Sequence, residues 1–187
     1  MGLKQKTCKS CRQKFAPSRP MQTACSPACA IAIAERKREK QAQQMAAEKR
    51  RETRQRLESM KGIPELIREA DKAFCAFVRA RDAGKPCICC GRYSSGWSRG
   101  GDWDAGHYRS RGAASHLRYH EDNCNSQLKQ CNRRAFDVAS YRANLIGRIG
   151  LARVETLEND NGTHKWTRDE LKAIKAEYIR KRKEIEA

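Results

Sequence analysis

Apolar residues recur at helical spacing between Gly62 and Gly84, and this pattern predicts one amphipathic helix. The apolar positions fall three or four residues apart, as expected for a helix with one buried face. They are Leu66, Ile67, Ala70, Phe74, Phe77 and Val78. Pro64 suits the first turn of this helix, and Gly84 is placed to end it.

Three further segments past Asp137 have the same periodicity and predict a C-terminal helical region. The first ends at Gly150, the second at Asn161, and the third follows Thr167. Thr167 and Glu170 have the spacing of a capping box, which predicts the start of the last helix. The apolar residues of these segments are Val138, Tyr141, Leu145, Ile146 and Ile149, then Leu151, Val154 and Leu157, then Leu171, Ile174, Tyr178, Ile179 and Ile185. We expect these helices to be structural.

Residues 31–61 contain few apolar side chains and consist largely of Ala, Gln, Glu, Lys and Arg, without Pro or Gly. Residues of this kind have high helix propensity and predict one long helix. Because the apolar positions form no heptad repeat, a coiled coil is not supported. Basic residues outnumber acidic ones, which leaves two interpretations: a solvated spacer, or a helix lying along a phosphate backbone.

The stretch 85–134 lacks helical periodicity and predicts short strands and loops. Residues 91–101 are rich in Gly and Ser and indicate a loop. Residues 103–108 are one strand candidate, and the alternating residues 116–120 are a second. A short helix is expected near Cys131. Taken with the helices, these elements predict an α+β fold that is mostly helical.

The N-terminal 30 residues contain two close cysteine pairs. Such spacing suits a tetrahedral zinc site with four thiolate ligands. Only 6% of the residues are aromatic, so the chain can bury little apolar surface and small metal-stabilised modules are expected. The predicted ligands of this zinc finger are Cys8, Cys11, Cys25 and Cys29. The finger either contacts DNA or only anchors the helix that follows.

A second group of cysteines lies between residues 87 and 131 and predicts a second structural zinc site. A site formed by Cys87, Cys90, Cys124 and Cys131 would be closed and would hold the first predicted strand against the following helix. Cys89 leaves open which of two adjacent thiols binds the ion, although the spacing of Cys87 and Cys90 favours the latter.

Asp104, His107, Asn123 and Asn132 lie between or beside these cysteines and have the chemistry of a phosphodiesterase. A neutral imidazole can deprotonate water near pH 7. A divalent cation can stabilise the developing charge and the leaving oxygen. Carboxylate and carboxamide oxygens suit Mg²⁺ or Mn²⁺. These four residues are therefore the candidate catalytic and cation-binding residues.

The formal net charge of +18 indicates a polyanionic partner. Nucleic acid fits best, and an anionic membrane surface is the weaker candidate. No apolar run approaches the length of a membrane span, and the N-terminus lacks the apolar core of a signal peptide. We therefore expect DNA as the partner, no membrane association, and a cytoplasmic location.

The motifs of the chain resemble those of the phage NinG family over nearly its whole length. The matching segments are Cys8-Lys-Ser-Cys11, Cys25-Ser-Pro-Ala-Cys29, Pro86-Cys87-Ile-Cys-Cys90, Trp103-Asp-Ala-Gly-His107, Glu121-Asp-Asn123 and Cys131-Asn132. The resemblance implies a structure-specific DNA endonuclease that cleaves branched intermediates of phage recombination, including Holliday junctions and D-loops, in the host cytoplasm.

The same residues resemble the ββα-metal core of His-Asn-His nucleases. The resemblance implies that His107 is the general base at the end of the first strand and that Asn123 ties the adjoining loop to it. It implies that Asn132 ligates the catalytic Mg²⁺ or Mn²⁺. Asp104 is the second candidate ligand, although the acidic residue usually lies next to the histidine.

The chain departs from the family pattern in two places. NinG-like chains carry a Cys-x-x-Cys before the final Asn, and here the first of these positions is Leu128, so Cys124 is the expected substitute. The family's Ser-Gly-Asn after that Asn is Ala135-Phe136-Asp137 here, and activity is expected to differ if this segment helps to form the site.

The sequence thus predicts four parts: a zinc finger (1–30), a basic linker helix (31–61), an HNH-like nuclease core with its preceding helix (62–137) and a C-terminal helical region (138–187). Two zinc ions are expected per chain, and symmetric cutting of a junction would favour a homodimer. The alternatives are a non-catalytic zinc-containing protein that binds branched DNA, and a basic adaptor between protein partners.

Overall fold

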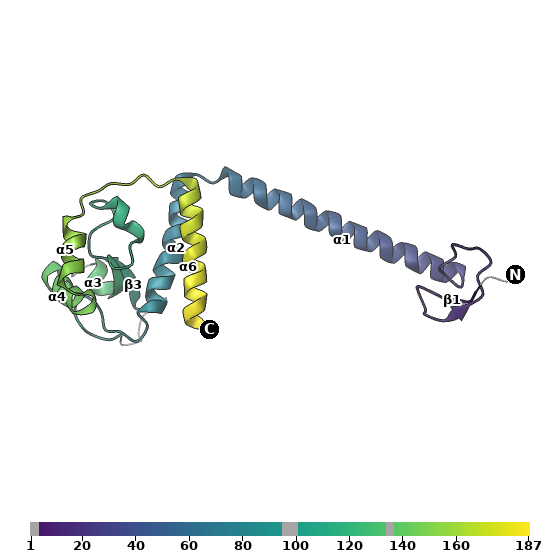
Figure 1. The fold of residues 1–187 in the computed structure, drawn as a ribbon, viewed down its shortest axis with the longest axis horizontal. Coiled ribbons are helices and arrows are strands. Elements are labelled where there is room, and N and C mark those ends of the chain that lie inside the picture. The colour runs from purple at the N-terminus through teal and green to yellow at the C-terminus, as the bar shows by residue number, and fades with distance from the viewer. Residues whose placement is uncertain (1–3, 95–100, 134–136) are drawn as a thin grey trace. The chain divides into compact units, whose positions relative to one another are not determined.

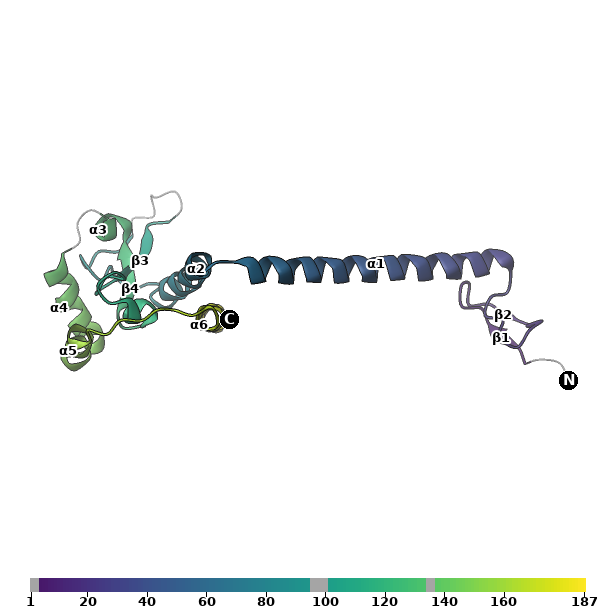
Figure 2. The same ribbon diagram turned by 90° about the horizontal axis from the view of Figure 1, so that it is seen from above.

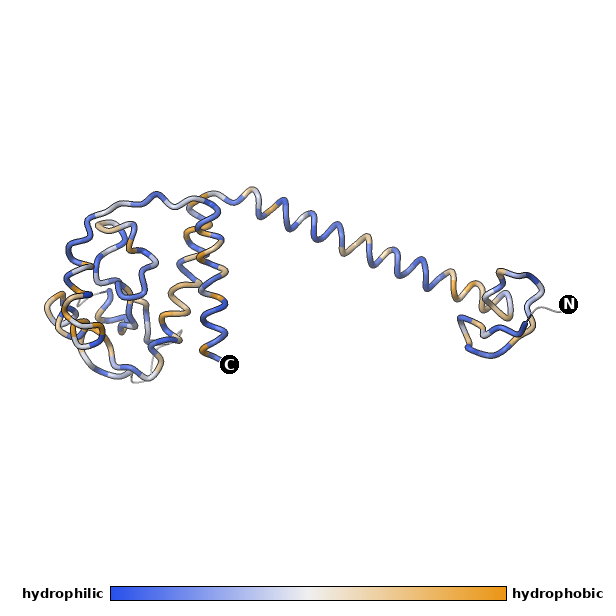
Figure 3. Tube along the Cα trace, viewed as in Figure 1, coloured by the Kyte–Doolittle hydropathy of each residue, from blue (hydrophilic) through white to orange (hydrophobic). Residues whose placement is uncertain are grey.

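The computed structural model describes residues 4–94, 101–133 and 137–187, which form two compact units, Met1–Met60 and Lys61–Ala187 (Figure 1). In the first unit, strands β1 (Lys6–Thr7) and β2 (Lys14–Phe15) pair antiparallel and precede helix α1 (Pro27–Met60). The prediction of one long helix is confirmed. None of its residues is buried, and its trace is mostly hydrophilic (Figure 3). Helix propensity, rather than packing, therefore maintains α1.

The second unit surrounds a two-stranded hairpin with helices. Its elements are α2 (Ile63–Arg81), β3 (Trp103–His107), the 3₁₀ helix η1 (Ser115–Tyr119), β4 (Cys124–Leu128), α3 (Lys129–Arg133), α4 (Val138–Ile149), α5 (Leu151–Asn159) and α6 (Arg168–Glu186). Figures 1 and 2 show the hairpin between α2 and α4. Among the described residues, no helix is both long and apolar enough to cross a membrane.

Most helices of this unit begin and end close to where the sequence predicts, but α2 ends at Arg81 with Asp82 as its C-cap, three residues before the predicted Gly84. Pro lies in the first turn of α2, and α4 ends at Gly150, which has a φ of 84° that favours glycine. The capping box of α6 is confirmed, because the Thr167 side chain accepts from the Glu170 backbone and the Glu170 side chain accepts in return. These capping signals involve residues within one turn of the helix end, so they do not depend on tertiary contacts.

Two apolar clusters cover the two sides of the hairpin. The first joins α2 to α6, which lie side by side, and contains Phe74 against Tyr178 with ring centroids 4.7 Å apart. The second joins α4 and α5 to the segment around Ile88 and Leu117. The C-terminal helices are therefore packed into the same unit as the hairpin that they cover.

Strands β3 and β4 pair antiparallel, with His107 opposite Cys124 and Trp103 opposite Leu128. The strand predicted at 103–108 is confirmed. The strand predicted at 116–120 is wrong, because this segment forms η1. Its carbonyl groups bond side chains rather than a neighbouring strand: Leu117 O accepts from Asn123 and Arg118 O contacts the His107 ring.

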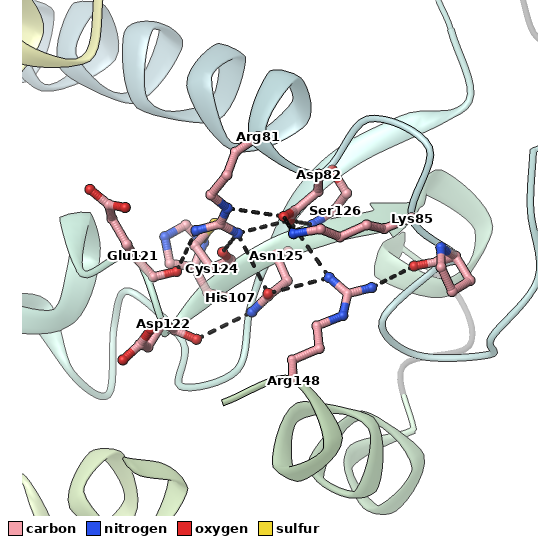
Figure 4. A network of polar contacts seen from close by, with 12 residues as sticks. Arg81, Asp82, Lys85, His107, Glu121, Asp122, Cys124, Asn125, Ser126 and Arg148 are labelled. Atoms are coloured by element: carbon pink, nitrogen blue, oxygen red, sulfur yellow. Dashed lines mark hydrogen bonds and ion pairs between the residues drawn. The ribbon is translucent and has the colours of Figure 1, made fainter. Parts of the chain in front are cut away.

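A buried carboxylate, Asp82, connects three elements of this unit (Figure 4). Asp82 is only 2% exposed, and it accepts hydrogen bonds from Arg81 at 2.8 Å, from Lys85 at 3.0 Å and from the backbone N–H of Ser126 at 2.9 Å. Arg148 of α4 lies 3.7 Å away. Burial alone would raise the pKa of Asp82, but these donors lower it below its ordinary value.

Replacing Asp82 with Asn should lower the free energy of unfolding by about 3 kcal/mol or more, because the clustered cations lose their buried counter-charge. The contribution should be complete above pH ~4 and should disappear as the pH falls through the lowered pKa of the folded state. Urea unfolding at neutral and acidic pH measures both effects. Glu184→Gln, which breaks an exposed pair with Arg180, is the control and should cost at most about 1 kcal/mol.

Candidate functional site

The four N-terminal cysteines come together as the sequence predicts. The Sγ atoms of Cys8, Cys11, Cys25 and Cys29 all lie within 4.8 Å of one another, a geometry that can hold a metal ion such as zinc. A hydrogen bond from the Cys11 backbone is the main cause that lowers the pKa of Cys8 to about 6, against desolvation. In the metal-free cluster this favours the thiolate at Cys8, whereas side-chain hydrogen bonds with Cys11 and Cys29 raise the pKa of Cys25 to about 12.

A second cysteine cluster forms where the chain enters and leaves the hairpin region. The Sγ atoms of Cys87, Cys90 and Cys131 lie within 4.8 Å of one another and can also hold a metal ion. The adjacent Cys89 is buried, and its thiol lies 3.9 Å from the carbonyl oxygen of Asp137. The structure therefore brings Cys90, not Cys89, into the cluster.

The structure corrects the expectation that Cys124 is the fourth ligand. Cys124 is fully buried in the cluster against α2, and its Sγ lies 3.8 Å from His107 Nδ1. Leu128 instead packs on the cysteine cluster, and its backbone N–H donates to Cys87 Sγ at 3.2 Å. These positions are four residues apart along the strand, a distance of about 13 Å, so Cys124 does not replace a ligand lost at Leu128.

His107, the last residue of β3, is held in a fixed orientation. Its Nε2 lies 2.9 Å from Arg118 O, and its ring centroid lies 6.2 Å from that of Phe74. A carbonyl can only accept, so Nε2 carries the proton and Nδ1 is the basic atom of the neutral ring. Burial is the main cause that lowers the pKa of His107, and the charge of Arg111 adds to it, against the bond to Arg118. The imidazole is therefore neutral at pH 7.

Two arginines lie beside this histidine and share one carboxylate. Asp71 of α2 accepts from Arg118 at 2.7 and 2.5 Å and from Arg111 at 3.0 Å. The Arg111 side chain is 49% exposed, so one positive charge next to His107 remains accessible to solvent. Sequence reasoning missed this group, because its members are 40 and 47 residues apart and no local pattern connects them.

Asn123 closes the loop that follows His107. Its Oδ1 accepts from the Arg109 N–H at 2.8 Å, and its Nδ2 donates to the carbonyl groups of Arg109 and Leu117, each at 3.1 Å. The Asn123 backbone carbonyl accepts from Tyr108 at 2.8 Å. All the polar atoms of this buried side chain are used, so Asn123 fixes the loop relative to β4.

Asp104 and Asn132 lie together at the other end of β3. Asn132 Nδ2 donates to Asp104 Oδ2 at 3.1 Å, and Arg133 Nε does so at the same distance. The carboxylate and the carboxamide thus offer hard oxygen donors to a cation. Successive side chains of a strand alternate, so Asp104 and His107, three residues apart, point to opposite faces of β3.

The segment that departs from the family pattern is only partly covered. Ala135 and Phe136 lie outside the described residues. Asp137 is the N-cap of α4 and accepts from the Ala139 N–H at 3.0 Å. A carboxylate is among the favoured N-cap groups, so Asp137 has a structural use at this position.

We predict that zinc-loaded protein contains two zinc ions and that Cys124→Ser leaves this content unchanged. Cys131→Ser should lose one ion, because it removes one of three clustered thiolates. Metal analysis of purified variants, with circular dichroism to confirm folding, measures both. Loss of an ion from folded Cys124→Ser would contradict the three-cysteine assignment.

Comparison with known proteins places this chain among phage proteins. A family model described as "Bacteriophage Lambda NinG protein" matches residues 1–187. The protein ninG of Salmonella phage P22 is 40% identical over 97% of this chain and 94% of its own. The protein ninG of Escherichia phage lambda is 39% identical over 97% and 93%, respectively. No solved structure gives a significant match. The chain therefore belongs to the NinG family of bacteriophage proteins.

Proposed function

We propose that this protein is a metal-dependent endonuclease that cleaves branched DNA, such as Holliday junctions and D-loops, during phage recombination. The observation that carries the proposal is His107, a neutral imidazole whose tautomer is set by Arg118 O and whose loop is closed by Asn123. A general base must be unprotonated and well oriented at working pH, and these contacts supply both conditions.

In this proposal, the residues around His107 divide the work of hydrolysis. Nδ1, which lies 3.8 Å from the Cys124 thiol, takes a proton from a water that approaches beside this thiol, and the Arg118 carbonyl stabilises the resulting imidazolium through Nε2. Arg111, half exposed and 3.0 Å from Asp71, lies where a phosphate approaching His107 would meet a positive charge. Asp104 and Asn132 would hold Mg²⁺ or Mn²⁺, which supplies further charge neutralisation when bound.

The charge of the chain supports DNA as the substrate. A net charge of +18 gives strong, salt-dependent attraction to a phosphate backbone. Helix α1 contributes a largely exposed basic surface, because none of its residues is buried. The two cysteine clusters would hold structural zinc, and the N-terminal one includes Cys29 in the first turn of this helix.

One observation favours a second candidate, a non-catalytic protein that binds branched DNA. Asp104 and His107 point to opposite faces of β3, whereas a single reaction centre requires the cation and the base near one phosphate. This candidate predicts tight, salt-sensitive binding to junctions without cleavage in any divalent metal.

His107→Ala should reduce cleavage of a four-way junction in Mg²⁺ or Mn²⁺ by about 10²-fold or more, because the general base is lost. Junction binding, measured by gel shift in EDTA, should remain nearly unchanged. His120→Ala is the matched control, since His120 is exposed and follows η1. Equal cleavage by His107→Ala and the wild type would exclude His107 as the base.

The rate of cleavage should rise with pH through the lowered pKa of His107 and become flat by pH 7, because only the neutral imidazole is active. Its acid limb should lie below the ordinary histidine value of about 6.5. Arg111→Gln removes a charge that lowers this pKa and leaves Asp71 with Arg118 as its remaining partner, so the limb should move to higher pH. Single-turnover rates between pH 5 and 8, chosen to span about 6.5, measure the shift. An unchanged limb would exclude His107 as the titrating group.

A further inference from the structure

Gln127 of β4 has no hydrogen-bond partner for its side chain among the described residues. The residue is 0% exposed, and neither Nε2 nor Oε1 is paired. The buried side chain of Asn125 in the same strand is paired, because its Nδ2 donates to the Asp122 carbonyl at 3.2 Å. Buried polar atoms in native proteins are almost always satisfied by protein, water or an ion, so this amide has room for a partner from outside the chain.

The position of this amide relates it to the oxygen donors of Asp104. Gln127 lies directly opposite Asp104 in the register of the hairpin, so the two side chains project from the same face. A Cβ added to Gly106 would lie 1.9 Å from Gln127 Oε1, so the amide rests on the Gly106 backbone. Gly106 is two residues after Asp104 and is on the same face. Its missing side chain therefore makes room for the Gln127 amide beside Asp104.

We propose that Gln127 is a third oxygen ligand, with Asp104 and Asn132, for a divalent cation of the Mg²⁺ or Mn²⁺ class. This inference rests on the proposed function and extends its cation site by a residue of β4. One carboxylate and two carboxamides form a hard donor set, and Mg²⁺ usually keeps several waters besides. The cation would satisfy Oε1 of Gln127.

Arg133 is the competitor for this site. Its Nε donates to Asp104 Oδ2 at 3.1 Å, so its guanidinium pairs with the carboxylate to which the cation would bind. The Arg133 side chain is 64% exposed and can turn into solvent when a cation arrives. Arg133 thus neutralises Asp104 in the metal-free protein, and binding of the cation exchanges one counter-charge for another.

The test measures Mn²⁺ binding by electron paramagnetic resonance on the zinc-loaded full chain, without DNA. Gln127→Leu removes both amide atoms at similar size and should weaken Mn²⁺ binding by about 10-fold or more. Gln130→Leu, the same change at an exposed position of α3, should leave the affinity unchanged. Wild-type affinity in folded Gln127→Leu would overturn the inference.

A second variant keeps the test decisive if Gln127→Leu does not fold. Gln127→Glu adds a carboxylate to the site, so it should bind Mn²⁺ more tightly than the wild type, and Mn²⁺ should raise its melting temperature by a larger amount. Unchanged or weaker binding by Gln127→Glu would also overturn the inference.

The outcomes separate this inference from the function on which it rests. If Asp104→Asn loses Mn²⁺ and Gln127→Leu does not, the Asp104 site stands and Gln127 is not a ligand. If the wild type binds no Mn²⁺ but cleaves junctions, the whole cation site is wrong, and only the part of the proposed function that rests on His107 survives.

Discussion

The Asp82 carboxylate is the interaction on which the second unit depends. It ends α2, accepts the Ser126 N–H in the middle of β4, and lies near Arg148 of α4 (Figure 4). A buried charge is tolerated only when it is paired and hydrogen-bonded, so these elements hold one relative position or leave the charge unsatisfied. Because β4 pairs with β3, the same carboxylate sets where His107 and Asp104 lie.

The hairpin is unusual because polar residues, not apolar ones, fill its second strand. Asn125, Ser126 and Gln127 of β4 are all buried, as is Asn123 just before the strand. Such residues fix a structure by bonds of defined direction, and Asn123 shows this where it joins the loop after His107 to β4. Gln127 differs from its neighbours because its side-chain amide has no partner among the described residues. This amide is therefore available to a cation, whereas the Asn123 amide is not.

The helices and the N-terminal cysteine cluster could be predicted from sequence because their signals are local. The capping box at Thr167 and the apolar spacing after Pro64 need no tertiary partner to be read. Strand β4 could not be predicted, because its buried residues are polar and show no alternation of polar and apolar positions. The residues of η1 do alternate, so the pattern predicts a strand there instead. The closeness of Cys124 to Cys131 in the sequence predicts a shared metal site. In the structure, however, Cys124 begins β4 opposite His107, at the other end of the strand from the cysteine cluster. Asp71 binds Arg111 and Arg118, which are 40 and 47 residues away in the sequence. No local sequence pattern spans such a distance, so these contacts could not be predicted.

Strand β3 is supported by a different device at each end. At its start, Trp103 and its partner Leu128 pack on the cluster of Cys87 and Cys131, so a bound metal would stiffen the end that carries Asp104. At its other end, Asn123 holds the loop that follows His107. The missing fourth cysteine therefore affects the end of the hairpin next to the cation donors, whereas the histidine depends on hydrogen bonds and on its packing near Phe74. Metal content and base orientation are thus separable properties of one short strand.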